Sequence, residues 1–450
     1  MVIKQFRYLQ KLPDSFLSLW RWKTETLRIN LIPIWRLGFV LICCALGSDW
    51  LRPLHVFANP NPDTEATRSV SELPGFDPKK YNPAVIHFRY TQAEGRTSSA
   101  KSDSFLDITL IPSSGDAEGF RVELSSKVFR DQLRQLYMQL SRLEPLKVED
   151  PESASRQLHA LFFSELQPVL QAKKVTTLLI AADRGLQAVP FAALSDGQQY
   201  FGDRFAFAIT PSLALTDFEQ KSSPDDRVLA LGASEFKGLA ALPLVPQELN
   251  RISSDEKKDK FLNQEFTPSS FLDKASDSGY STLHVATHAE FKPGGPEASQ
   301  LHSGTGPLSM KELATLREKR KGVPLDLVVF SACRTALGDA DAELGFSGLA
   351  LQAGARSAVG TLWYVDDVVT SAYFVQMYRY LEQGVPKAEA MQLTRQAFIR
   401  NQIKLSGKEL IGVDGIPLLQ ELTPSQQRRV SNGVANPFFW AGIELMGAPW

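Results

Sequence analysis

Apolar runs that alternate with helical segments from about residue 155 onward constrain the fold of this chain more than any other feature. The apolar runs lie at 176–182, 228–232, 282–287, 325–331 and 358–363. Such runs are typical of strands that are buried on both faces of a parallel sheet. The segments between them predict helices at 158–170, 245–253, 310–317, 347–353, 368–383 and 387–400. This alternation predicts an α/β fold, a mainly parallel sheet with helices on both faces.

A small β-rich extension is expected before this domain. Residues 84–90 and 105–111 alternate apolar and polar side chains as strands do, and 120–124 is expected to be a third strand. A helix with a period close to 3.6 residues is expected at 126–143, with Val128, Leu133, Leu136, Tyr137 and Leu140 on its apolar face. The predicted division is therefore an extension at 82–150 and a main domain at 151–450. Within the main domain, 402–433 is polar and is expected to be a surface insertion.

The first 58 residues have the pattern of a targeting segment. Residues 1–36 hold seven basic and two acidic side chains, and residues 37–46 carry no charge. A basic stretch followed by a short apolar run predicts a secretory signal peptide, here cleaved after Gly47 or Ala58. An uncleaved membrane anchor or the N-terminus of a cytoplasmic protein are the alternatives. Residues 59–81, rich in proline and acidic side chains, are expected to be a linker. The protein is accordingly expected to be exported or membrane-associated.

Composition argues against several classes of function. The 49 basic and 50 acidic residues nearly balance, so no nucleic-acid partner is expected. Two of the three cysteines, Cys43 and Cys44, lie in the apolar N-terminal run, which leaves Cys333 without a disulfide partner. The histidines do not show the spacing of a zinc site, and no glycine-rich phosphate-binding loop follows a strand. Neither a metal nor a cofactor is expected.

Two chemically reactive side chains follow predicted strands directly. His288 follows the strand at 282–287, and Cys333 follows the strand at 325–331. In open α/β sheets, ligands bind at the carboxyl ends of the strands, and neighbouring parallel strands end at the same edge. A cysteine thiolate is a nucleophile that a nearby imidazole can generate. If these two strands are neighbours, the pair is a candidate catalytic dyad, with the backbone N–H groups of Ala289 and Cys333 as oxyanion donors.

Each of these residues also has a simpler interpretation. A lone cysteine at a strand end is more often buried filler, and a lone histidine is more often a satisfied polar group. His284 lies inside the strand and is expected to be structural or to support the site. The acidic residues Asp339, Asp341 and Glu343 follow the cysteine. They form either a solvated loop or a pocket that attracts a basic substrate side chain.

Several motifs resemble the CHAT domain family, caspase-like clan CD cysteine peptidases related to separase and caspases. The most specific are Leu283-His-Val-Ala-Thr-His288 and Asp326-Leu-Val-Val-Phe-Ser-Ala-Cys-Arg-Thr335. The other matching segments, in the order of the family, are 178–194, 242–249, 306–309, 353–357, 360–367 and 436–440. The resemblance implies a caspase-like fold over roughly 155–450. It also implies that the strands at 84–124 are the sheet extension found in bacterial members.

The resemblance implies a cysteine endopeptidase that cleaves after arginine or lysine, with Cys333 as the nucleophile and His288 as the acid and base. Its partners would be a protein or peptide substrate and, because the chain has no tetratricopeptide repeats, a separate regulatory protein. Association with a membrane through the N-terminal segment is also expected. Ala289 stands where the family usually has glycine, and Leu344 where an acidic residue is usual. These departures favour the alternative, a catalytically weak or inactive caspase-fold scaffold that binds other proteins.

Overall fold

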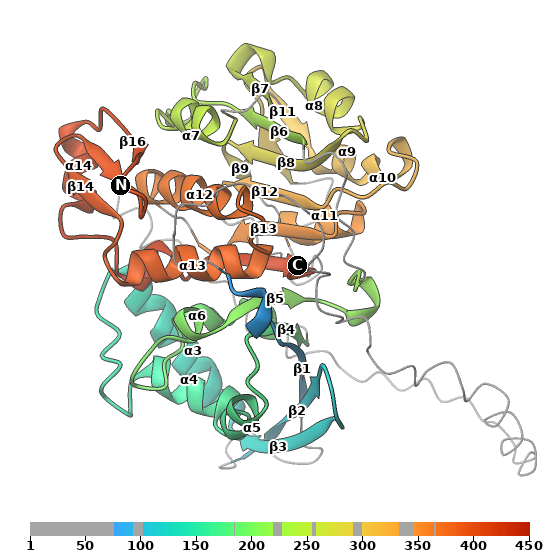
Figure 1. The fold of residues 1–450 in the computed structure, drawn as a ribbon, viewed down its shortest axis with the longest axis vertical. Helices are drawn as coiled ribbons and strands as arrows, with labels where there is room; N and C mark the ends of the chain where they lie inside the picture. Colours follow the sequence, from blue (N-terminus) through green and yellow to red (C-terminus); the bar gives the residue numbers. More distant parts are fainter. Residues whose placement is uncertain are drawn as a thin grey trace, which may run out of the picture.

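One sheet passes through the whole of the described molecule (Figure 1). The computed structural model describes residues 76–92, 102–183, 185–218, 227–253, 258–290, 299–332, 345–363 and 366–450. The sheet has 11 strands in the order β3-β2-β1-β4-β5-β17-β13-β12-β8-β6-β7. The expected signal peptide or anchor at 1–58 and most of the expected linker lie outside the described residues.

The sheet has two halves whose strands run in opposite directions. In the first half, β1 (Pro83–Gln92), β4 (Thr177–Ala182), β5 (Ala206–Thr210) and β17 (Ile443–Gly447) are parallel. In the second half, β13 (Ser357–Thr361), β12 (Leu327–Ser331), β8 (Tyr280–Ala286), β6 (Arg227–Gly232) and β7 (Lys258–Leu262) are parallel. The halves meet where β13 pairs antiparallel with β17. The prediction of an α/β fold with a mainly parallel sheet is confirmed.

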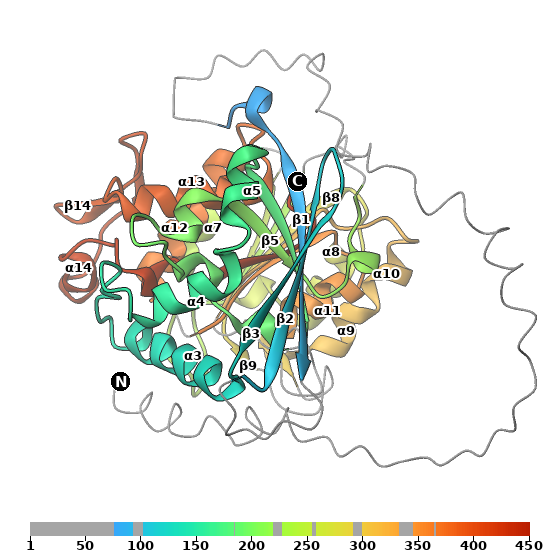
Figure 2. The same cartoon turned by 90° about the horizontal axis from the view of Figure 1, so that it is seen from below.

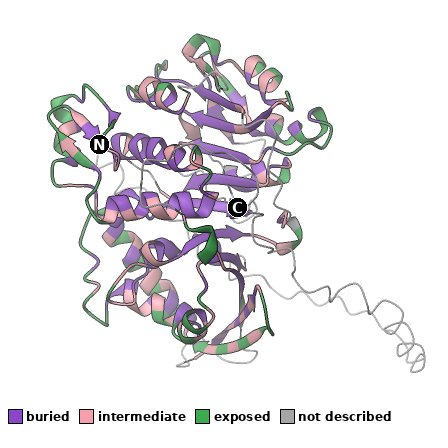
Figure 3. Cartoon of the chain, viewed as in Figure 1, coloured by how far each residue is buried: buried purple, intermediate pink, exposed green. Residues whose placement is uncertain are grey.

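Helices cover the second half of the sheet on both faces, which is why its strands carry apolar residues on both sides. One face packs against α7 (Val245–Ile252) and α12 (Asp367–Leu381), and α13 (Lys387–Ile399) lies beside α12 over β5 of the first half. The opposite face packs against α8 (Pro268–Ala275), α9 (Met310–Ala314), α10 (Leu316–Lys319) and α11 (Gly345–Gln352). Figure 3 shows the buried strands between these two layers. Along β8, Leu283 and Val285 belong to the second core and Ala286 to the first, as side chains that alternate across a strand must.

The predicted extension continues the main sheet (Figure 2). Strand β1 pairs antiparallel with β2 (Ser104–Pro112), which pairs antiparallel with β3 (Glu118–Leu124). On its other side, β1 pairs parallel with β4, so that Ile86 lies opposite Ile180. The three strands expected from the alternating pattern are confirmed, and their apolar side joins the principal core.

Helices of the first half lie beside these strands. They are α3 (Ser126–Ser141), α4 (Ala154–Phe163), α5 (Gln167–Ala172) and α6 (Phe201–Arg204). In α3 the expected face is partly wrong. Val128 is 55% exposed, whereas Phe129, Leu136 and Leu140 are buried. The spacing of 129, 136 and 140 corresponds to whole helical turns, so that Phe129 faces the core and its neighbour faces the solvent.

The polar segment at 402–433 forms its own small sheet. Its strands are β14 (Lys404–Ser406), β15 (Glu409–Ile411) and β16 (Pro417–Leu419), and α14 (Pro424–Val430) follows them. Leu410, Leu418 and Leu419 are buried in the principal core. Arg379 of α12 holds this segment through an ion pair with Asp414 at 2.7 Å. The segment therefore packs against the helical layer through leucines spread over a mostly polar sequence.

A second small sheet lies beside the carboxyl end of β8. It consists of β9 (Ala289–Glu290), β10 (Gln300–His302) and β11 (Pro307–Ser309). The sequence pattern did not predict it, because two- and three-residue strands carry too few side chains to show a period. Its position fixes the backbone that follows His288. Among the described helices, none is both long and apolar enough to cross a membrane.

Candidate functional site

The two strands that precede His288 and Cys333 are neighbours in the sheet. Strands β8 and β12 are parallel, and Ala286 lies opposite Ser331. The condition stated for the candidate dyad, that these two strands are neighbours, is met. His288 is two residues past Ala286, and Cys333 is two residues past Ser331 in the sequence. Cys333 itself lies outside the described residues, as do Leu344 and the acidic residues Asp339, Asp341 and Glu343.

The ring of His288 is held by the segment that follows β6. Its Nε2 lies 2.8 Å from the carbonyl oxygen of Ala240. The ring of Phe236, in the same segment, packs against the imidazole with 4.7 Å between ring centroids. A carbonyl oxygen can only accept a hydrogen bond, so Nε2 carries a proton and donates it. In the neutral imidazole, Nδ1 is then the nitrogen with the lone pair that can accept a proton.

The backbone after His288 leaves one N–H group directed away from the small sheet. The N–H of His302 donates to the carbonyl of His288 at 2.9 Å, and Leu301 lies opposite Ala289. This bond flanks the pair, so Ala289 and Leu301 form a non-hydrogen-bonded pair of the antiparallel ladder. The N–H of Ala289 therefore points away from β10. Its methyl group packs against the second core.

His284 lies inside β8, as expected, and is fully buried. Its Nε2 lies 2.9 Å from Oε1 of Glu248 on α7. The other oxygen of Glu248 accepts a hydrogen bond of 2.6 Å from the hydroxyl of Ser371 on α12. Burial, together with the nearby charge of Glu248, holds the pKa of the Tyr378 hydroxyl beside this pair well above its ordinary value. Glu248 was not predicted as a site residue, although the sequence carries a signal: it lies among Val245, Leu249 and Ile252 on the buried face of a short helix.

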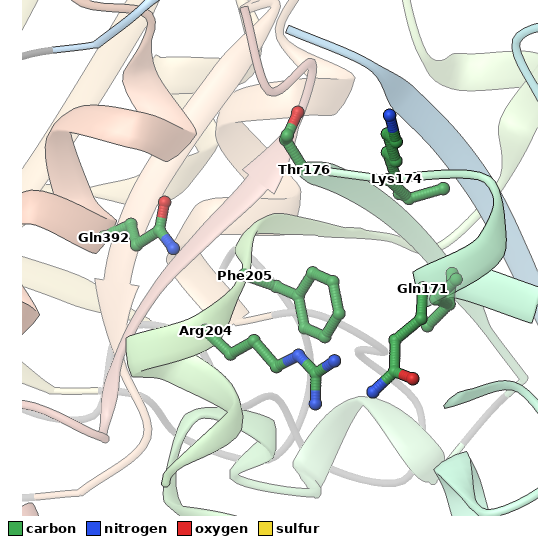
Figure 4. A pocket seen from close by; sticks show the side chains of 8 residues that line it. Gln171, Lys174, Thr176, Arg204, Phe205 and Gln392 are labelled. Atoms are coloured by element: carbon green, nitrogen blue, oxygen red, sulfur yellow. The ribbon is translucent and has the colours of Figure 1, made fainter. Parts of the chain in front are cut away.

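Two cavities lie away from His288, in the first half of the sheet. One of about 320 Å³ opens at the amino ends of β4 and β5, where Figure 4 shows Gln171, Arg204 and Gln392 around Phe205. The other, of about 260 Å³, lies at the carboxyl ends of β4 and β5, with His87 and Asp183 in its wall. Because β4 and β8 run in opposite directions, this second cavity lies at the edge of the sheet opposite to His288.

No group of three or more His, Cys, Asp or Glu side chains arranged to hold a metal ion occurs in the described part of the chain. The chemistry that the site can perform is proton transfer at Nδ1 of His288 beside a group at the end of β12.

Comparisons with solved structures found similarity at low sequence identity. The separase–securin complex of Saccharomyces cerevisiae matches at 10% identity with a TM-score of 0.49, over 82% of this chain. The present chain spans only 30% of the chain that it matches in that complex. The Arg-specific cysteine proteinase gingipain R (RGPB) matches at 12% identity with a TM-score of 0.42, over 72% of this chain and 75% of the other. The complex of Porphyromonas gingivalis RgpB pro- and mature domains matches at 11% identity with a TM-score of 0.40, over 72% and 77%. No curated protein matches the chain.

The family comparison covers most of the main domain. The model of the CHAT domain matches residues 152–448. The matched range contains β8, β12 and the loop segment that contacts His288. It begins after α3, so the three strands of the extension precede it. The chain belongs to the CHAT domain family.

Proposed function

We propose that this protein is a cysteine endopeptidase in which Cys333 is the nucleophile and His288 is the general acid and base. The observation that carries the proposal is the register of two parallel strands, in which Ala286 lies opposite Ser331. The two strands end at the same edge of the sheet, and the histidine and the cysteine each follow two residues later in the sequence. Membership of the CHAT domain family supports the same assignment.

In the proposed reaction, Nδ1 of His288 takes the proton of the Cys333 thiol. The thiolate attacks the carbonyl carbon of the scissile peptide bond, a C–S bond forms, and the carbonyl electron pair moves to oxygen. The backbone N–H groups of Ala289 and Cys333 donate hydrogen bonds to this oxyanion. The imidazolium returns its proton to the leaving nitrogen as the C–N bond breaks. A water molecule, deprotonated by His288, then hydrolyses the thioester.

The carbonyl of Ala240 supports this role of His288 in both protonation states. In the neutral ring it holds the proton on Nε2, which leaves Nδ1 free to act as the base. In the imidazolium, the same N–H donates a charge-assisted hydrogen bond to the carbonyl, which is stronger than the neutral one. The ring of Phe236 fixes the plane of the imidazole. The orientation of the base is thus set before substrate binds.

Ala289 is compatible with the oxyanion role despite the glycine that is usual there. Its N–H points away from β10, and its methyl group packs against the second core.

The proposed substrate specificity is cleavage after arginine or lysine. The support is chemical: Asp339, Asp341 and Glu343 place three acidic side chains shortly after the nucleophile, and these would attract a basic side chain.

The proposal includes a protein or peptide substrate, a separate regulatory protein, and export or membrane anchoring through residues 1–58. The N-terminal charge pattern supports the last point. Its test is fractionation of cells that express the full chain, with mass spectrometry of its N-terminus. Recovery of the intact chain in the soluble cytoplasmic fraction would reject both export and anchoring.

The proposed enzyme is tested by covalent labelling of the full chain with an arginyl chloromethyl ketone, read by intact mass. Cys43 and Cys44 are replaced by serine so that Cys333 is the one remaining thiol. We expect one label per chain and loss of labelling in Cys333→Ala and His288→Ala. A matched aspartyl chloromethyl ketone, the aspartyl probe, is expected to react more slowly. His87→Ala is the matched control, because His87 lies at the opposite edge of the sheet and is expected to leave labelling unchanged.

A scaffold without catalysis is the second candidate, favoured by the replacement of glycine by Ala289 and of an acidic residue by Leu344. The same experiment decides between the two. If the thiol of Cys333 reacts no faster than free cysteine and is indifferent to His288→Ala, the enzyme is excluded and the scaffold takes its place. If the thiol is activated but the arginyl probe has no advantage over the aspartyl probe, the enzyme stands and the basic specificity fails.

A further inference from the structure

Two contacts join β8 and the residues after it to α7 and the loop before it. One contact lies at the candidate site, and the other lies in the core beneath it. The first connection is the hydrogen bond from Nε2 of His288 to the carbonyl of Ala240. The second is the contact of 2.9 Å between Nε2 of His284 and Oε1 of Glu248. His284 and His288 are four residues apart on β8 and its extension. Ala240 and Glu248 are eight residues apart, in the loop before α7 and on α7 itself.

The deeper connection is closed to solvent. His284 is 0%, Glu248 1% and Ser371 4% exposed. Nδ1 of His284 is buried and has no hydrogen-bond partner among the described residues, so the orientation of this ring depends on Glu248. The rings of Phe374 and Tyr378 meet the imidazole edge-on, at centroid distances of 5.8 and 5.5 Å. Within the described part of the chain, the contact with Glu248 is the hydrogen bond that holds this ring.

Ser371 extends the connection to a third element. Its hydroxyl donates to Oε2 of Glu248, which ties α7 to α12. The loop between β6 and α7 is in turn closed on itself, because the N–H of Leu242 donates to the carbonyl of Ser234 at 2.9 Å. At its other end the loop is joined to α7, because the N–H of Val245 donates to the carbonyl of Leu242 at 3.2 Å. A movement of α7 therefore displaces the end of the loop next to the helix, which includes the carbonyl that holds His288.

We propose that Glu248 is a positioning residue for His288. Its hydrogen bonds with His284 and Ser371 fix the position of α7 along β8. In that position the Ala240 carbonyl reaches Nε2 of His288. Without this connection, the carbonyl moves away, the proton is no longer held on Nε2, and Nδ1 loses its role as the base. The inference rests on the proposed role of His288 as acid and base. It adds a residue that does not touch the substrate.

The test compares Glu248→Ala with Glu248→Gln in the full chain that lacks Cys43 and Cys44. Alanine removes both hydrogen bonds, whereas the glutamine amide can still accept from His284 and donate to Ser371. With the arginyl chloromethyl ketone as probe, we expect the maximal rate of alkylation to fall about 10–100-fold in Glu248→Ala, since a displacement of about 1 Å costs about that much. The probe concentration at half-maximal rate is expected to stay unchanged, and Glu248→Gln is expected to restore most of the rate.

A control separates positioning from loss of stability. Glu389→Ala also removes a buried carboxyl that accepts a hydrogen bond from a strand residue, Thr177, but it lies on α13. It is expected to destabilise the fold and to leave the rate per folded molecule unchanged. If Glu248→Ala does not fold, Ser371→Ala, which removes one of the two bonds, is expected to lower the same maximal rate several-fold.

A second readout follows the imidazole directly. With nitrogen-15-labelled histidine, the chain has six rings to assign, and His288→Ala identifies the signals of that ring. We expect an Nε2–H tautomer in the unsubstituted protein and in Glu248→Gln, and a mixture of tautomers in Glu248→Ala or Ser371→Ala. A folded Glu248→Ala with an unchanged tautomer and rate would overturn the inference and leave the proposed enzyme intact. If His288→Ala itself leaves alkylation unchanged, the proposed function fails, and the positioning role fails with it.

Discussion

At the scale of single residues, the environment of each side chain decides what its chemistry is. His288 and His284 are four residues apart, yet His288 is partly exposed and His284 is fully buried. The partner of His288 is a carbonyl that fixes a tautomer, and the partner of His284 is a carboxylate that joins two elements. Glu389 is a third case: burial raises the pKa of its carboxyl to about 7, and the hydrogen bond from Thr177 opposes this only in part.

The raised pKa of Glu389 predicts a pH dependence of stability. The stability contributed by the neutral carboxyl is fully present below its ordinary pKa of 4.5 and is lost as pH rises through about 7. Glu389→Gln keeps an acceptor for Thr177 but never ionises. We expect it to be more stable than the unsubstituted protein above pH 7, by up to about 3 kcal/mol, and to lose this advantage near pH 4.5. Urea unfolding between pH 4.5 and 8.5 measures the difference, and an advantage independent of pH would contradict it.

At the scale of elements, the start of α12 shows how a local signal becomes a tertiary contact. Aspartate is a favoured N-cap residue, and Asp366 accepts hydrogen bonds from the backbone N–H groups of Val368 and Val369 at 3.0 and 3.2 Å. Arg429 of α14 adds an ion pair at 2.9 Å to the same carboxylate. Burial raises the pKa of Asp366, and the charge of Arg429 opposes this rise. The cap therefore also anchors the small sheet region to the helical layer.

Removal of this cap is expected to weaken α12. Asp366→Ala should lower the free energy of unfolding by about 1–2 kcal/mol, the range for loss of a helix N-cap. Asp366→Asn retains a side-chain oxygen that caps the helix but loses the ion pair, so it should recover most of the loss. Chemical denaturation at neutral pH provides both values. Equal losses in the two variants would show that the ion pair with Arg429, and not the cap, is the main contribution.

At the scale of the whole molecule, the two halves of the sheet meet at one antiparallel pair, β13 with β17. Consequently the carboxyl ends of β8 and β12 lie at the opposite edge from those of β1, β4 and β5. The site at His288 and the cavity at His87 and Asp183 are thus on opposite sides of the sheet. Gly447 closes this junction with a positive φ of 90°, and the carbonyl of Arg356 accepts from the N–H of Ala448 next to it.

Substitution of Gly447 tests how tightly the halves are joined. A Cβ atom there would lie 2.2 Å from the carbonyl oxygen of Arg356, so the backbone of the junction must shift. Gly384→Ala is the matched control: its φ is 78°, but no atom lies within 4 Å of the added methyl. The control should cost about 1–2 kcal/mol of stability for the left-handed backbone. Gly447→Ala should cost about 1–3 kcal/mol more, the usual effect of overpacking, measured by urea unfolding. Equal losses of unfolding free energy in the two variants would show that the backbone of the junction shifts without cost.

The sequence alone determined the elements with a clear local pattern and the residues at their ends. Apolar runs predicted β4, β6, β8, β12 and β13. The positions directly after two of these strands indicated His288 and Cys333 as candidate site residues. Strands β5 and β7 were missed: β5 follows the one-turn helix α6 after a single residue, so no turn marks its start, and β7 is an edge strand with the polar sequence Lys258-Asp-Lys. A short or polar strand is stabilised by its partners rather than by its own pattern, so its pairing is invisible in the sequence.

Only the tertiary structure decided which strands are neighbours and what each buried polar group contacts. Ala240 contacts His288, 48 positions further along the chain, and Glu248 contacts His284, 36 positions further along. No local period records such pairs. The same holds for Val128 and Phe129, whose exposure depends on which side of α3 packs against α4, where the ring of Phe129 contacts that of Phe162. Local patterns are set by neighbouring residues and can be recognised in the sequence. The contacts that orient His288 are set by the packing of distant elements, because burial and hydrogen bonding are satisfied jointly across the whole core.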